Sequence, residues 1–125
     1  MKCLYSLINC TILTVDRNDR FFEDGIIVVE NNKIKEIGSK EKVIPKGIIY
    51  DMEGKLVMPG LINTHTHSHS SIFKNQADDF KLMDWLKKAM WPMEKYLSAD
   101  RAYAATALSC YEYIKSGITC YADQF

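Results

Sequence analysis

Three histidines, His65, His67 and His69, stand at alternate positions in one stretch and are all the histidines of the chain. If this stretch is a β-strand, side chains two residues apart project from the same face. A neutral imidazole is a common ligand of Zn²⁺ and Fe²⁺. Two strand residues in these positions have Cα atoms about 6.6 Å apart, a gap that two imidazoles can bridge to one ion. The pattern predicts that His65 and His67 bind a divalent metal ion; the alternative is a pair of solvent-exposed loop histidines.

His69 is expected to differ from this pair. It would lie about 13 Å from His65 if the strand continued, too far to share the same ion. We therefore expect His69 to lie in the loop that follows the strand. A catalytic zinc ion usually has three protein ligands and a water molecule. Because the chain has no fourth histidine, the third ligand is either Asp123 or a residue outside this sequence.

The elements around the histidines indicate a parallel sheet. The apolar run 56–62 shows no alternation, which is typical of a strand buried on both faces. The histidine pair follows this run directly, and sites in parallel α/β folds gather at the carboxyl ends of strands. Residues 118–122 form a second apolar run, which ends at Asp123. A long helical segment separates the two runs, so the order predicts a β-α-β unit.

The segment between these strands has two helical patterns. Apolar residues recur near a 3.6-residue spacing over residues 82–97, where Pro92 is expected to break the helix and to push Trp91 out of the helical region. Ser98 is expected to cap the next helix, which should end at Gly117. That helix carries one apolar stripe, formed by Tyr103, Ala104, Ala107, Leu108, Tyr111 and Ile114.

The first part of the chain, to about Lys55, reads as short strands joined by tight turns. The expected strands are residues 7–15, 25–30, 33–37 and 48–50. Asn31 and Asn32 separate the second from the third, and asparagine tolerates the positive φ of a hairpin turn. These strands are too few to close a core alone, so they need partners from elsewhere.

Composition excludes several classes of protein. The chain has 125 residues, of which 47% are hydrophobic and 26% charged, as in a globular protein in water. Sixteen basic and sixteen acidic residues cancel, so we expect neither a nucleic-acid nor a membrane partner. The four cysteines form no Cys-x-x-Cys pair, which favours reduced thiols in a cytoplasmic protein over a disulfide framework or a cysteine zinc site.

The ordered motifs resemble the metal-dependent amidohydrolase superfamily, in particular its branch of nucleoside and guanine deaminases and chlorotriazine hydrolases. The resemblance runs through the whole chain. It rests on Asp51-Met-Glu-Gly-Lys-Leu-Val-Met-Pro-Gly-Leu-Ile-Asn63, Thr64-His-Thr-His67, Ala77-Asp-Asp79, Asp84-Trp-Leu86, Pro92-Met-Glu94 and Gly117-Ile-Thr-Cys-Tyr-Ala-Asp123.

This resemblance implies an α/β fold in two parts. Residues 1–57 would be the N-terminal half of a small β-sandwich. Residues 58–125 would supply the first two strands and helices of a (β/α)₈ TIM barrel, which is incomplete because such a barrel takes roughly 250 residues.

The resemblance also implies a site. It assigns His65 and His67 to one divalent metal ion, zinc before iron, and Glu94 to contact with the ribose of the substrate. An ordinary charge in the first turn of a helix is the alternative for Glu94. Trp85 is expected to pack rather than to form a substrate platform. No residue of the chain is assigned as the catalytic acid or base.

The implied function is that of the N-terminal portion of a hydrolase acting on carbon–nitrogen bonds other than peptide bonds. The complete enzyme would deaminate a purine-like or related heterocycle through a hydroxide on the metal. We expect the 125 residues alone to be inactive and poorly stable. Lys74-Asn75, where many relatives carry Arg-Gly, and Gln124, where methionine is frequent, leave the substrate open. A homo-oligomer of the full-length protein also remains open.

Two alternatives belong to other classes. One is a cyclic amidase of the hydantoinase and dihydroorotase type, with two ions bridged by a modified lysine; the Asp-Trp-Leu and Pro-Met-Glu segments argue against it. The other is a small, non-catalytic β-rich module, complete as it stands, which would unfold cooperatively without any dependence on metal.

Overall fold

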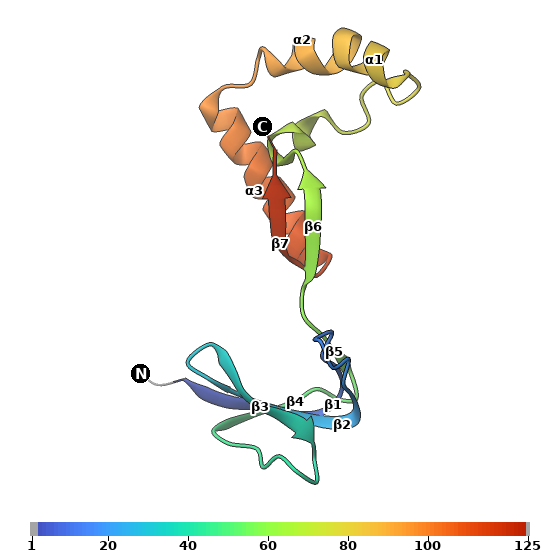
Figure 1. The fold of residues 1–125 in the computed structure, drawn as a ribbon. Coiled ribbons are helices and arrows are strands. Elements are labelled where there is room, and N and C mark those ends of the chain that lie inside the picture. Colours follow the sequence, from blue (N-terminus) through green and yellow to red (C-terminus); the bar gives the residue numbers. More distant parts are fainter. Residues whose placement is uncertain (1–2, 125) are drawn as a thin grey trace. The chain divides into compact units, whose positions relative to one another are not determined.

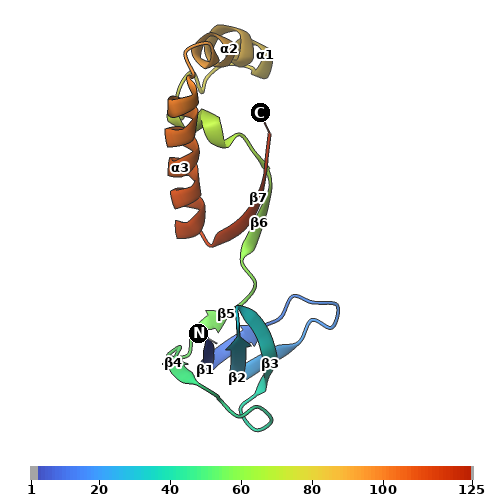
Figure 2. The same ribbon diagram turned by 90° about the vertical axis from the view of Figure 1, so that its left-hand side faces the viewer.

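The computed structural model describes residues 3–124, which divide into two compact units between Pro59 and Gly60. Among these described residues, the first unit is built of strands, and the second contains two strands and the helices (Figures 1 and 2). No helix among the described residues is long and apolar enough to cross a membrane.

The first unit is a five-stranded sheet organised around β1 (Leu4–Leu13). This strand pairs antiparallel with β2 (Phe21–Glu30) and parallel with both β4 (Ile48–Asp51) and β5 (Leu56–Val57). β2 continues through a hairpin into β3 (Lys33–Ser39). Asn31 and Asn32 form that turn with φ values of 51° and 63°. The hairpin prediction is confirmed, and its basis is the tolerance of asparagine for positive φ.

Apolar side chains cover both faces of this sheet. One cluster contains Cys10, Ile12, Ile27 and Val29, and the other contains Ile26, Val28 and Val43. Because adjacent residues of a strand point to opposite faces, the unbroken apolar run of β2 supplies both clusters.

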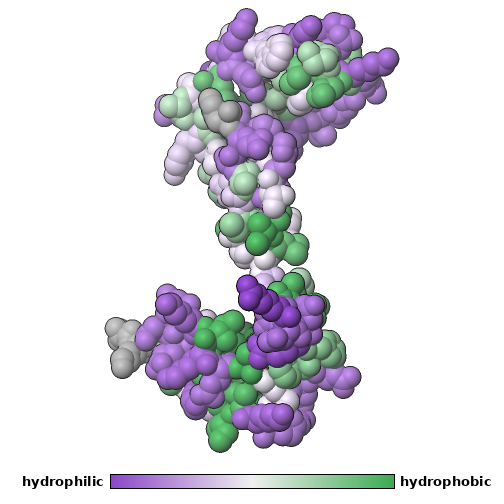
Figure 3. Space-filling model, in the orientation of Figure 1, coloured by the Kyte–Doolittle hydropathy of each residue, from purple (hydrophilic) through white to green (hydrophobic). Residues whose placement is uncertain are grey.

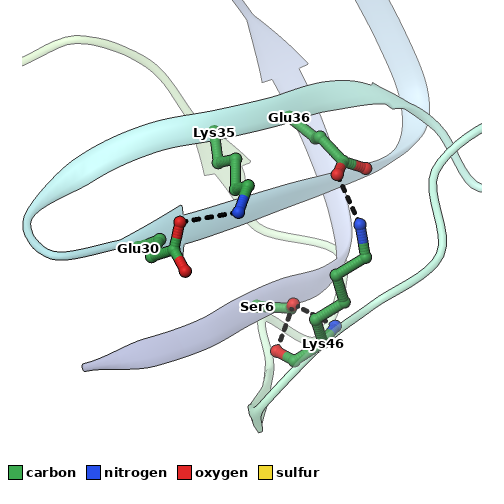
Figure 4. A network of polar contacts seen from close by, with 5 residues as sticks. All are labelled: Ser6, Glu30, Lys35, Glu36 and Lys46. Carbon is green, nitrogen blue, oxygen red and sulfur yellow. Dashed lines mark hydrogen bonds and ion pairs between the residues drawn. The ribbon is translucent and has the colours of Figure 1, made fainter. Parts of the chain in front are cut away.

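Polar contacts fix the segment that leads into β4 (Figure 4). The buried hydroxyl of Ser6 donates to the carbonyl of Lys46 over 2.8 Å and accepts from its amide over 2.7 Å. The Lys46 ammonium in turn pairs with Glu36 of β3. On the same hairpin, Lys35 Nζ lies 2.6 Å from Glu30 Oε2. These contacts tie β1, β3 and the loop before β4 together.

The second unit is a β-α-β unit, as the sequence predicts. Its strands β6 (Leu61–Thr66) and β7 (Ile118–Asp123) pair in parallel. Between them lie a 3₁₀ helix η1 (Ser68–Phe73), α1 (Leu82–Trp85), the π-helix η2 (Leu86–Met90), α2 (Trp91–Glu94) and α3 (Ala99–Lys115). Helix α3 lies along one face of the strand pair (Figure 2).

The expectation of a single buried strand over residues 56–62 is wrong. The Met58-Pro59-Gly60 segment separates β5 from β6, because proline supplies no amide hydrogen to a ladder. Ile62 of β6 is 69% exposed. Figure 3 shows hydrophobic surface, in green, where the two strands of this unit begin. Two strands with helices on one face leave the other face uncovered.

Pro92 does not break the helix that contains it, so this prediction is also wrong. Trp91 has φ −60° and ψ −38°, which are ordinary helical values. The wider π turn of η2 immediately precedes the proline, and such a turn makes room for a ring that lacks an amide hydrogen.

Helix α3 has the predicted ends but packs through another face than its apolar stripe. Ser98 accepts a hydrogen bond from the amide of Arg101, and Gly117 follows the helix with φ 77°. Small residues, Ala105 and Ser109, are the buried ones. The larger side chains of the stripe are exposed, with Tyr103 at 79%. Only small residues allow η1 to approach the helix closely.

Candidate metal centre

The predicted histidine pair lies at the carboxyl end of β6. His65 belongs to the strand and His67 follows its last residue. The two imidazole rings are neighbours, with centroids 5.1 Å apart and planes inclined by 80°. Both side chains are exposed. The structure therefore brings together the two residues that the sequence assigns to one ion.

A hydrogen bond to the end of β7 sets the tautomer of His67. Its Nδ1 atom lies 2.9 Å from the backbone carbonyl oxygen of Gln124. A carbonyl oxygen only accepts, so Nδ1 carries the hydrogen, and in the neutral ring Nε2 has the lone pair that a metal ion needs. The amide of Gln124 donates to the carbonyl of Thr66 over 3.0 Å, which holds the two strand ends side by side.

Asp123 does not join the histidine pair as a third ligand. Its Oδ1 accepts from the amide of Ser68 over 2.9 Å, and its Oδ2 accepts from the hydroxyl of the same residue. These two hydrogen bonds hold the pKa of the Asp123 carboxyl below its usual value, and the bond from the Ser68 hydroxyl has the larger effect. Within residues 3–124 no three His, Cys, Asp or Glu side chains cluster as metal ligands would. The described residues thus bring together two candidate ligands, His65 and His67.

His69 lies elsewhere than expected. It belongs to η1 and is only 7% exposed, so it is not a loop residue in solvent. Its Nε2 atom lies 3.9 Å from Oε1 of Glu94, and its ring centroid is 6.2 Å from that of His67. Two buried serines of η1, Ser68 and Ser71, are hydrogen-bonded to α3, so the segment that carries His69 packs against this helix.

Glu94 and His67 line one pocket of about 280 Å³. Its wall also includes apolar side chains from the helices and a basic side chain from the loop after η1: Phe73, Lys74, Trp85, Leu86 and Met90. Lys74 pairs with Glu112 of α3, and the Trp85 indole donates to the carbonyl of Gln76 over 3.3 Å. The family resemblance already places Glu94 beside the substrate, and in the structure the helical segment 82–94 reaches His67 through this shared pocket.

The chain is similar to known deaminases along nearly its whole length. It is 43% identical to the 5'-deoxyadenosine deaminase of Methanosarcina mazei, over 94% of this chain and 27% of that protein. It is 39% identical to the 5-methylthioadenosine/S-adenosylhomocysteine deaminase of Bacillus cereus, over 100% of this chain and 29% of that protein. The chain therefore spans less than a third of the length of these relatives.

Solved structures share the fold. A triazine hydrolase from Arthobacter aurescens matches 97% of this chain with a TM-score of 0.83 and 23% identity, and the match covers 28% of that chain. Guanine deaminase of E. coli matches with a TM-score of 0.77 and 24% identity, over 97% of this chain and 30% of its own. These matches confirm the predicted α/β fold class as the N-terminal part of such structures. The Amidohydrolase family model matches residues 56–124, more than half of the sequence, so the chain belongs to the amidohydrolase family.

Proposed function

We propose that the chain is the N-terminal portion of a metal-dependent deaminase that hydrolyses the exocyclic carbon–nitrogen bond of a purine-like heterocycle. The supporting observation is the adjacent pair of His65 and His67 at a strand end, with the tautomer of His67 set by the Gln124 carbonyl. The deaminases to which the chain is similar act, by their names, on 5'-deoxyadenosine, methylthioadenosine and adenosylhomocysteine.

His65 and His67 would hold one divalent ion, zinc before iron. Two imidazoles fit such an ion, and the zinc complex of the Arthrobacter aurescens chlorohydrolase TrzN, which shares the fold, supports this metal. An ion of this kind acts as a Lewis acid and lowers the pKa of a water molecule toward 7. The other protein ligands and the acid–base residue would lie outside residues 3–124. Residues 1–57 would be half of a β-sandwich domain and residues 58–125 the start of a TIM barrel, in a cytoplasmic enzyme.

Glu94 would bind the sugar of the substrate. A carboxylate has two acceptor oxygens and can accept one hydrogen bond from each of two neighbouring hydroxyls, such as those of a ribose. Its place on the wall of the pocket that also contains His67 supports this role. The apolar side chains of the same wall would exclude water from the ligand.

Substrate comparison tests the proposal. The full-length protein that contains this chain, reconstituted with zinc, should release ammonia from 5'-deoxyadenosine. Glu94→Gln should raise the KM for this nucleoside at least about tenfold, since one charged hydrogen bond contributes roughly 1.5–3 kcal/mol, which corresponds to about 10- to 150-fold. The KM for the free base adenine, which lacks the sugar, should not change. Equal effects on nucleoside and base would contradict the assignment of Glu94, and the absence of turnover of any purine would contradict the proposed reaction.

We also propose that residues 1–125 alone are inactive, because residues 3–124 supply two of the usual three protein ligands and leave Leu61 and Ile62 of β6 exposed. Zinc-dependent turnover by the purified 125-residue chain, free of host deaminase, would contradict this.

A further inference from the structure

We propose that Asp123 is a positioning residue for the metal pair: through Ser68 it fixes the backbone at His67 and thereby aims that imidazole. This inference rests on the proposed function, since it assumes that His65 and His67 bind the ion. It replaces the idea that Asp123 is itself a ligand, because both of its carboxylate oxygens are engaged by Ser68.

The backbone at His67 needs a restraint. This residue has φ −126° and ψ 75°, which belong to neither a helix nor a regular strand. Its ψ torsion turns the peptide group whose N–H is that of Ser68. Because Asp123 Oδ1 accepts from this N–H over 2.9 Å, the carboxylate holds the torsion. The direction in which the His67 side chain leaves the chain is held with it.

A second restraint acts on the ring itself. The carbonyl of Gln124 accepts from Nδ1 of His67. Asp123, the last residue of β7, and Gln124, which follows it, thus hold His67 through the Ser68 amide and through its imidazole, respectively. The contribution of Gln124 comes from the main chain. Its side chain should therefore be replaceable, which makes this position a matched control for Asp123.

Helix α3 braces the same serine from the other side. The Ser68 hydroxyl lies 3.1 Å from the Thr106 hydroxyl, and the Ser68 carbonyl accepts from the Ser109 hydroxyl over 2.9 Å. Ser68 is only 1% exposed. Because each polar group of this buried serine is hydrogen-bonded, Ser68 has little freedom to move. The position of Asp123 therefore restricts the backbone of the adjacent His67. Substitution of a residue that orients a metal-bound histidine typically weakens metal binding by 10- to 100-fold.

The test uses four variants of the full-length protein, with zinc affinity measured by competition with a chromophoric chelator. Asp123→Ala should weaken zinc binding by about 10- to 100-fold. Asp123→Asn retains one acceptor for the Ser68 amide and should recover part of that loss. Gln124→Met, which keeps the carbonyl, and Asp100→Asn, an exposed carboxylate at the start of α3, should bind zinc within twofold of the wild type.

Nitrogen-15 NMR of the zinc-free protein separates positioning from a general loss of stability. The His67 ring should be the Nδ1–H tautomer in the wild type and a mixture of tautomers in Asp123→Ala. If that variant does not fold, Asp123→Asn and Ser68→Ala provide the same comparison. Folded variants that bind zinc like the wild type and keep the tautomer would overturn the inference alone. A wild type that binds no zinc would overturn the proposed function, and the inference with it.

Discussion

Nε2 of His69 lies 3.9 Å from Oε1 of Glu94, so a buried histidine of η1 faces the carboxylate that we assign to the substrate's sugar. This contact joins the segment after the metal pair to α2, the helix that carries Glu94. The His69–Glu94 contact therefore connects the segment that follows the proposed metal ligands to the residue proposed to bind the sugar.

His69→Gln should raise the KM for 5'-deoxyadenosine by up to about fivefold, because the imidazole beside Glu94 restricts the position of its carboxylate and a polar contact of this kind contributes up to about 1 kcal/mol. The KM for adenine should stay the same, since the base does not need Glu94. Steady-state kinetics of the zinc-loaded, full-length protein with both substrates measure this difference. The double variant with Glu94→Gln is the control, and additive effects of the two substitutions would show that His69 does not act through Glu94.

Gly25→Ala should destabilise the β-sheet unit by about 1–3 kcal/mol, the usual cost of overpacking a core. A Cβ at this position would lie 2.2 Å from Cδ1 and 2.7 Å from Cγ1 of Ile12, a core side chain that is 1% exposed, so this side chain would have to shift. Urea denaturation measures the effect. In an Ile12→Val background, which lacks Cδ1, Gly25→Ala should lower the free energy of unfolding by less. An equal loss in both backgrounds would show that this clash is not the cause.

The stability of the same unit should fall in acid partly through Asp51. The amide of Glu53 and then the side chain of Asn9 hold the pKa of this carboxyl below its ordinary value of 3.8. A lowered pKa stabilises the folded state above pH 3.8, and the contribution disappears as the pH falls through the folded-state pKa. Asp51→Asn should therefore lower the urea midpoint at pH 6 and change it less at pH 3. Glu23→Gln, an exposed carboxyl of the same unit, is the control, and an equal loss at both pH values would contradict this role.

The sequence predicts local features well where one residue type determines the backbone. Asn31 and Asn32 mark the hairpin because they tolerate positive φ, and Ser98 and Gly117 mark the ends of α3 for equally local reasons. The pair His65 and His67 follows from the two-residue period of a strand.

Features that depend on distant partners could not be predicted in this way. The burial of His69 depends on the packing of η1 against α3, and the hydrogen bond between Asp123 and Ser68 depends on the parallel pairing of β6 and β7. The apolar stripe of α3 suggested one packing face, whereas close approach of η1 selected the small side chains of Ala105 and Ser109. The continuous helical values at Trp91 depend on the π turn before Pro92.

The proposed metal-dependent deamination is tested most directly by ammonia release from 5'-deoxyadenosine, measured with the full-length protein before and after removal of its metal. Chelation should abolish turnover, and one equivalent of zinc should restore it in the wild type. His65→Ala and His67→Ala should remain inactive at the same zinc concentration because each loses a ligand. Turnover that survives complete removal of metal, or that persists in His67→Ala, would contradict the account.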